Sequence, residues 1–220
     1  MKKLLLSLCT VLVASVTATT AFAQDKVGDP NAGEKKNALC VGCHGITGYH
    51  TGFPEVHKVP KISGQSAKYI VNALKAYKSG ERKHPSMRGV AANLTEQDMA
   101  DLAAYYANNG RLLPDPEKAA GGSEKAQELV TKGGCTTCHG ENFSKPMDPA
   151  YPKIAGQHSD YLYFALKAYK TEGVNLIGRN NPIMSGVAKQ FTNAELKVLA
   201  DYVGSLPGQL QTVQRDRIRK

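Results

Sequence analysis

CVGCHG, at residues 40–45, places two cysteines two residues apart directly before a histidine. This pattern is found in redox dithiols, in halves of zinc sites and at points of covalent haem attachment. The stretch CTTCHG at residues 135–140 repeats it, with His139 in the place of His44. An interpretation of the first motif must therefore also explain the second.

The repeat extends far beyond the two motifs. PKISGQSAKYIVNALKAYK at residues 60–78 returns as PKIAGQHSDYLYFALKAYK at 152–170. HPSMRGVAANLTEQD at residues 84–98 returns as NPIMSGVAKQFTNAE at 181–195. The two copies therefore differ in length only in their connecting loops, and the chain is a tandem duplication.

The N-terminal residues 1–23 have the features of a secretory signal peptide. Lys2 and Lys3 precede an apolar run that ends in an A-x-A-like cleavage pattern at Ala21-Phe22-Ala23. A membrane anchor is the alternative, but a spanning helix needs about 20 largely apolar residues. This run is shorter and is interrupted by Ser and Thr, so we expect cleavage and export. The cysteines that remain all lie in the two motifs: Cys40, Cys43, Cys135 and Cys138.

Two domains are predicted after the signal peptide, at residues 24–113 and 124–220. Between them, residues 114–123 contain Pro and Gly without helical periodicity and are typical of a linker. The length of each half suits one domain of about 100 residues. No segment shows sustained period-two alternation, so the predicted fold class is all-α, without a sheet.

Helix boundaries can be predicted from capping residues. A helix is expected to begin after Asp29-Pro30 and to run into Cys40, and another to begin at Ser123. A longer helix is expected from near Ser66 to near Gly80, with a counterpart in the second half. The last helix of each half begins with a predicted capping box, formed by Thr95 with Asp98 and by Thr192 with Glu195.

The spacing of the motifs decides between zinc, dithiol and haem. A zinc ribbon pairs its C-x-x-C units across roughly 15–20 residues, whereas 91 residues separate Cys43 from Cys135. A thioredoxin-like dithiol expects a βαβ setting, which this helical chain lacks. Two cysteines one helical turn apart can both reach the vinyl groups of one porphyrin, and the next histidine then falls under the iron. The sequence predicts two covalently bound haem c groups, with His44 and His139 as axial ligands.

Methionines at matching places in the duplication are the predicted second axial ligands. Met87 and Met184 lie 43 and 45 residues beyond the motif histidines, and a thioether ligand raises the reduction potential of haem iron. His84 is a local competitor, but the second copy has Asn181 at that place. Met99, on the apolar face of the last helix, is predicted to fill the core instead.

Each predicted methionine ligand lies in a P-x-M-x-G-V-A segment that we expect to be extended. Pro85 and Pro182 should keep the chain out of a helix, and Gly89 and Gly186 should permit a close approach.

The motif histidines also need an acceptor for their second ring nitrogen. The backbone carbonyls of Pro60 and Pro152, at equivalent places in the two PKI-x-GQ segments, are candidates; loop rigidity alone is the other explanation for these prolines. His50, His57 and His158 have no match in the duplication and are predicted to be surface histidines.

Two modules that each combine C-x-x-C-H, P-x-x-x-GQ, LKAYK and P-x-M-x-G-V-A resemble the dihaem cytochrome c4 family. The resemblance covers nearly all of the chain after residue 23. It implies two tandem class I cytochrome c domains that face each other, two His/Met haems, and a periplasmic electron carrier that reaches a terminal oxidase and is not an enzyme. The departures are two longer loops, with FPEVHKV before Pro60 and TEGVNLIGRNNPIM in the second ligand loop.

An alternative function is left open by the same motifs. Dihaem modules that resemble this one also act as electron-accepting subunits of sulfide or thiosulfate dehydrogenases. Without Lys2 and Lys3 the formal net charge of +9 falls to +7, and four ionised haem propionates would reduce it to about +3. This modest positive charge suits docking to acidic redox proteins, including membrane respiratory complexes, and leaves peripheral membrane association open. Nucleic-acid binding has no place in an exported haem protein.

Overall fold

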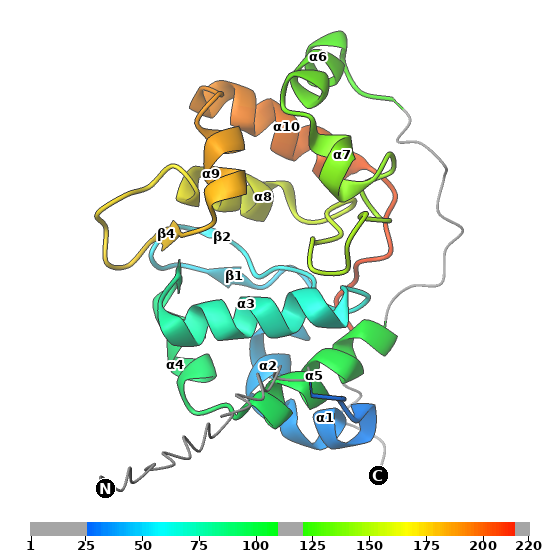
Figure 1. Cartoon of the computed structure of the whole chain (residues 1–220), viewed down its shortest axis with the longest axis vertical. Helices are drawn as coiled ribbons and strands as arrows, with labels where there is room; N and C mark the ends of the chain where they lie inside the picture. The colour runs from blue at the N-terminus through cyan, green and yellow to red at the C-terminus, as the bar shows by residue number, and fades with distance from the viewer. Residues whose placement is uncertain (1–25, 110–120, 214–220) are drawn as a thin grey trace, which may run out of the picture.

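The computed structural model describes residues 26–109 and 121–213, which form two helical domains stacked one above the other (Figure 1). The predicted signal peptide and most of the predicted linker lie outside the described residues. The first domain contains α1 (Pro30–Lys36), α2 (Ala38–His44), α3 (Ala67–Ser79), α4 (Pro85–Ala92) and α5 (Glu96–Asn108). The second contains α6 (Glu124–Lys132), α7 (Cys135–His139), α8 (Ser159–Ala168), α9 (Pro182–Ala188) and α10 (Asn193–Ser205).

Four very short strands accompany the helices in the described part of the chain. β1 (His50–Thr51) pairs with β2 (His57–Lys58) in an antiparallel hairpin, and β3 (Arg82–Lys83) pairs with β4 (Gly178–Arg179) across the domain boundary. The expectation that the chain has no sheet was therefore wrong in detail. Strands of two residues are too short to leave a period-two pattern in the sequence.

The capping predictions are confirmed at most helix ends. Ser66 precedes α3, and Gly80 ends it in the left-handed conformation at φ 87°. Both predicted capping boxes are present, at the starts of α5 and α10. Asp29 caps α1 as expected, but that helix stops at Lys36 and α2 starts after Asn37, so two helices replace the single one predicted to reach Cys40.

The expectation of extended methionine segments was wrong. Met87 lies in α4 and Met184 in α9, and Pro85 and Pro182 are the first residues of these helices. Proline is tolerated at this position because its missing N–H would have no partner within the helix anyway. The prolines therefore start the helices that carry Met87 and Met184 instead of preventing them.

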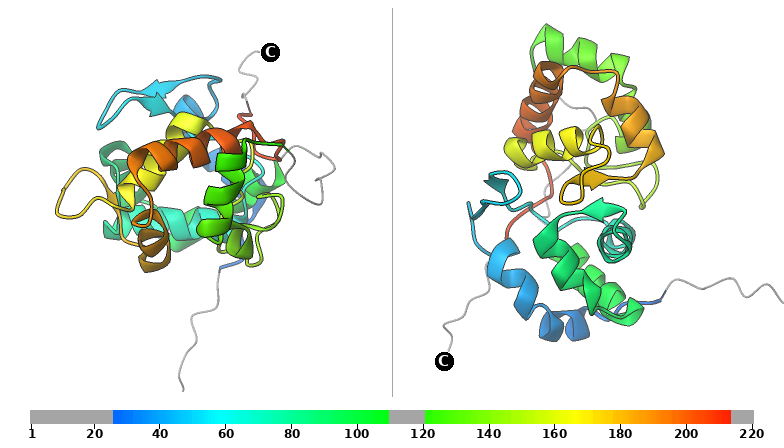
Figure 2. Two further views of the ribbon diagram at one scale, coloured as in Figure 1. Left: turned by 90° about the horizontal axis from the view of Figure 1, so that it is seen from above. Right: turned by 90° about the vertical axis from the view of Figure 1, so that its left-hand side faces the viewer.

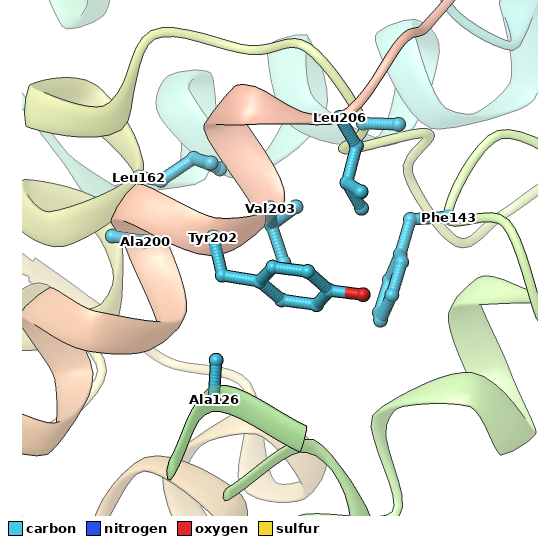
Figure 3. Packing of buried hydrophobic residues seen from close by; sticks show 8 residues of the cluster. Ala126, Phe143, Leu162, Ala200, Tyr202, Val203 and Leu206 are labelled. Atoms are coloured by element: carbon cyan, nitrogen blue, oxygen red, sulfur yellow. The ribbon is translucent and has the colours of Figure 1, made fainter. Parts of the chain in front are cut away.

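Each domain packs its last helix across its first. In the first domain α5 crosses α1 so closely that Gly33 is buried against the backbone of Asp101. Met99 is 1% exposed on α5 and fills the core as predicted. In the second domain the core joins α6, α8 and α10, and Figure 3 shows Tyr202 and Phe143 meeting edge to face, with ring centroids 6.4 Å apart.

The longer loop of the first domain reaches the second domain. It forms the β1–β2 hairpin, which lies beside α8 in Figures 1 and 2. Lys58 N donates to Asp160 Oδ2 at 3.1 Å, and Glu55 forms an ion pair with Lys167. His57 stacks on Phe164 with ring centroids 4.2 Å apart and is only 3% exposed. The prediction of a surface histidine was wrong for His57, because its burying partner comes from the other domain.

The longer loop of the second domain makes the return contact. It carries β4, and Val174 O in this loop accepts a hydrogen bond from Lys83 Nζ of the first domain at 2.8 Å. After α10 the chain runs back along the first domain, where Gln211 N donates to Ser63 O at 3.0 Å and Gln211 Nε2 to Asn109 O at 2.6 Å. Both departures from the repeat therefore build the domain boundary.

Within residues 26–109 and 121–213, no helix is both long and apolar enough to cross a bilayer.

Candidate functional site

Both C-x-x-C-H motifs open onto one continuous cavity of about 620 Å³ that extends through both domains. Its walls are mostly apolar side chains, as is usual for sites that hold an organic cofactor. Every residue predicted to bind haem lines it: Cys40, Cys43, His44 and Met87 from the first domain, and Cys135, Cys138, His139 and Met184 from the second. The duplication thus places two equivalent sets of groups around a shared space.

The motif cysteines are free thiols presented by α2 and α7. Burial raises the pKa of Cys40 and of Cys135 to about 11. Redox dithiols and thiolate metal sites instead depend on thiols whose pKa is lowered. No group of three or more His, Cys, Asp or Glu side chains able to hold a metal ion occurs in the described part of the chain.

The motif histidines are oriented by backbone carbonyls. His44 Nδ1 lies 2.8 Å from Pro60 O, and His139 Nδ1 lies 2.9 Å from Pro152 O. A carbonyl can only accept, so each Nδ1 carries the proton and each Nε2 keeps its lone pair for a metal. Burial lowers the pKa of both imidazoles, which favours this neutral form.

The two methionines approach the cavity from helices other than those of the motifs. Met87 is the third residue of α4 and Met184 the third residue of α9. Asn181 caps α9 by accepting from Met184 N at 2.9 Å, and His84 holds the equivalent place before α4. A Cβ built on Gly89 or Gly186 would meet no atom of another described segment within 4 Å, so neither glycine serves a close approach to another part of the described chain.

Sequence reasoning missed a pair of arginines on the cavity wall. Arg82 and Arg179 stand on the paired strands β3 and β4, at equivalent places in the duplication. Arg82 donates to Tyr69 Oη at 3.2 Å and to Tyr161 Oη at 2.7 Å, and Arg179 donates to Tyr161 Oη at 3.1 Å. The matching Arg in the second repeat, five residues before Met184 as Arg82 is before Met87, was the signal that could have found them.

The arginine pair places two buried positive charges close together, and a bound anion would compensate them. Neither guanidinium bonds to a carboxylate within the described ranges, although buried charges are normally paired. Burial alone would raise the pKa of Tyr161, but Arg179 and Arg82 outweigh it and lower that pKa to about 8. Arg82 Nε and His84 Nδ1 are buried without a hydrogen-bond partner. Apolar walls, thiols, neutral imidazoles, thioethers and this unpaired charge together fit a porphyrin with carboxylate side chains.

Comparison with known proteins agrees with this chemistry. The cytochrome c family pattern matches residues 32–109 and 123–207, once in each domain. Cytochrome c4 of Pseudomonas aeruginosa is 31% identical over 216 residues, covering 94% of this chain and all of the relative. The thiosulfate dehydrogenase electron acceptor of Stutzerimonas stutzeri is 28% identical, over 92% of this chain and 94% of the relative.

Solved structures give the same result. The reduced recombinant cytochrome c4 from Pseudomonas stutzeri superimposes with a TM-score of 0.63 and 28% identity, over 82% of this chain and 100% of that structure. Two class I cytochrome c domains, each with its own attachment motif, correspond to two covalently bound haem c groups and to electron transfer. The chain therefore belongs to the cytochrome c4 family of dihaem cytochromes.

Proposed function

We propose that this protein carries electrons in the periplasm to a terminal oxidase and performs no substrate chemistry of its own. The observation that supports this is the pairing of a histidine and a methionine on the wall of the cavity in each domain. Two such ligands would leave no coordination position of a haem iron open to a substrate. Bound haem supplies one-electron cycling between Fe(II) and Fe(III).

The residues divide the work of holding each haem. Cys40 and Cys43 would tether the first, and His44 and Met87 would bind its iron. Cys135, Cys138, His139 and Met184 would hold the second in the same way. The carbonyls of Pro60 and Pro152 fix the rings of the two histidines, and the thioethers favour the reduced state.

Arg82 and Arg179 would bind the haem carboxylates in this proposal. A guanidinium presents a planar set of donors that suits a carboxylate, and it keeps its charge when buried. Carboxylates would also compensate the positive charge that lowers the pKa of Tyr161. The arginines thereby keep two negative charges inside the protein at a tolerable cost in free energy.

The periplasmic location and the acidic partner are supported by the sequence. Residues 1–23 have the pattern of a cleaved signal peptide, and without Lys2 and Lys3 the chain has a formal net charge of +7. A basic surface speeds association with an acidic partner by roughly 10–10³-fold at low ionic strength. The electron-transfer rate to the oxidase should therefore fall as salt is added.

A second partner deserves a direct test, because one relative bears the name of a thiosulfate dehydrogenase electron acceptor and matches 92% of the chain. In this case the protein takes electrons from the dehydrogenase. Stopped-flow reduction by thiosulfate and a thiosulfate dehydrogenase, compared with oxidation by membranes that contain a terminal oxidase, separates the donor side from the acceptor side.

Carbon monoxide tests the proposal that both irons lack an open position. The purified ferrous protein should bind carbon monoxide slowly and incompletely, because a methionine must leave first. A pyridine haemochrome assay on the same sample should give two c-type haems per chain. Rapid and complete carbon monoxide binding to native protein would show an open iron and would favour an enzyme.

A further inference from the structure

Two buried glutamines cross the domain boundary in opposite directions. Gln65 and Gln157 hold equivalent places in the PKI-x-GQ segments, and each is 5% exposed. Gln157 Oε1 accepts from Lys61 N and Gln157 Nε2 donates to Lys61 O, both at 2.9 Å. Gln65 does the same to Lys153, with Oε1 accepting at 3.0 Å and Nε2 donating at 2.9 Å. Each side-chain amide therefore pairs with the backbone of one lysine in the other domain.

Each glutamine oxygen also accepts a hydrogen bond from a backbone N–H of its own domain. Ser66 N donates to Gln65 Oε1 at 2.9 Å, and His158 N donates to Gln157 Oε1 at 3.0 Å. Two N–H donors to one atom identify that atom as the oxygen and fix its direction. Each glutamine oxygen therefore accepts one hydrogen bond from its own domain and one from the other.

The lysine N–H groups are the other ends of the peptide groups that orient the motif histidines. Lys61 N belongs to the same peptide group as Pro60 O, which accepts from His44 Nδ1 at 2.8 Å. Lys153 N likewise belongs to the group of Pro152 O, the acceptor for His139 Nδ1. A hydrogen bond at the N–H of an amide polarises its C=O and strengthens the bond made there.

We infer that Gln157 is a positioning residue for His44, and Gln65 for His139, so that each domain tunes the haem of the other. This inference rests on the proposed function, in which both histidines are iron ligands. A stronger bond at Nδ1 raises the basicity of the imidazole toward a metal. A more basic ligand favours ferric iron, so the contact of the domains lowers both reduction potentials.

Substitution by methionine tests this inference in the full-length protein with both haems. Gln157→Met keeps the volume of the side chain but removes the strong acceptor from Lys61 N. The ferrous-to-ferric ratio of the haem on His44 should rise about threefold at a fixed solution potential, since such polarisation changes the strength of a hydrogen bond by about 10–30%. Threefold corresponds to about 28 mV, because tenfold is about 59 mV for a one-electron couple. Gln65→Met should act in the same way on the haem of His139.

Gln211 supplies the matched control. It also joins the domains through its side-chain amide, to Asn109 O at 2.6 Å, and its backbone N–H donates to Ser63 O, so its described hydrogen bonds go to neither proline peptide group. Gln211→Met should shift neither potential. A glutamine that served only to join the domains would behave like Gln211, or would disturb both haems equally.

The two haems are followed separately through the ¹H NMR signals of the ligand methionine methyl groups during a redox titration. A shift confined to the opposite domain supports the inference; no shift, equal shifts, or a shift in the same domain overturns it. Intact methyl signals from Met87 and Met184 in a variant without a shift would leave the proposed function standing. Their absence from the wild-type protein would contradict the proposed ligands instead.

The wild-type protein provides a second measurement that does not depend on the folding of any variant. Coupling free energies are reciprocal, so oxidation of the haem on His44 must strengthen the bond from Lys61 N to Gln157. Hydrogen exchange at Lys61 N and Lys153 N should be about threefold slower in the oxidised than in the reduced protein, by the same polarisation. Equal or faster exchange in the oxidised protein overturns the inference.

Discussion

Replacing Gly33 with alanine should force α1 and α5 apart in the first domain. A Cβ built on Gly33 would lie 2.1 Å from Asp101 O, 2.6 Å from Asp101 C and 2.8 Å from Tyr105 Cβ. These are backbone or backbone-attached atoms of a regular helix, so no side-chain rotation can relieve the contact. Because α1 leads directly to α2, the movement would reach the haem attachment motif.

The expected loss of stability follows from two opposing effects. Overpacking costs about 1–3 kcal/mol, and the upper end applies here because the contacts involve backbone. Alanine in a helix is favoured over glycine by about 1 kcal/mol. The net destabilisation of the first domain should be about 2 kcal/mol, which corresponds to a decrease of about 8–16 °C in its Tm.

Thermal unfolding followed by circular dichroism and by the Soret band measures this effect. Gly42→Ala is the control, since Gly42 is an exposed residue of α2 and a Cβ built there would meet no atom within 4 Å. That variant should be as stable as the wild type or up to about 1 kcal/mol more stable. A Tm for Gly33→Ala at or above that of Gly42→Ala would refute the close helix crossing.

Three further predictions concern the ligands, the arginine pair and pH. Met87→Ala and Met184→Ala should each abolish the iron–sulfur charge-transfer band of one ferric haem and lower its potential; two unchanged haems would contradict the ligand assignment. Arg82→Leu should lower a haem potential by up to about 65–130 mV in spectroelectrochemistry, because a hydrogen bond to a charged group contributes about 1.5–3 kcal/mol; an unchanged potential would place the guanidinium away from both haems. Asp101 accepts from Asp29 N at 2.9 Å and from Lys36 Nζ at 2.6 Å, and these bonds lower its pKa. The stabilisation from these bonds is complete above the unfolded-state pKa of about 3.9 and is lost as pH falls through the lower pKa of the folded state. Acid should therefore destabilise the wild type more steeply than Asp101→Asn. At pH 7 the Asp101→Asn variant should already be about 1–3 kcal/mol less stable than the wild type.

Local chemistry made much of the fold predictable. Capping boxes depend on residues three apart, and Thr95 with Asp98 shows this clearly. The duplication also identified the cavity-lining sets, because it paired Met87 with Met184 and separated both from Met99. Such features depend only on residues close together in the sequence or on the comparison of the two repeats, so the sequence alone predicts them.

The contacts between the domains could not be read in this way. His57 is buried by Phe164, which lies more than 100 residues away in the sequence. The second repeat has no histidine that matches His57, so the duplication gave no signal for this contact. Arg82 and Arg179 become a charge pair only when β3 and β4 meet. The misassigned methionine segments have a different cause, since a proline stops a helix in its interior but starts one at its first position.

The reciprocal pairing of Gln65 with Lys153 and of Gln157 with Lys61 has a consequence for how this chain arose. A surface that contacts its own copy, residue for residue, is the isologous interface of a homodimer with twofold symmetry. A single-domain ancestor with this patch could associate before any gene fusion. Fusion would then raise the effective concentration of the two halves without creating a new contact. The tandem chain is, in these terms, a dimer whose subunits have become permanently connected.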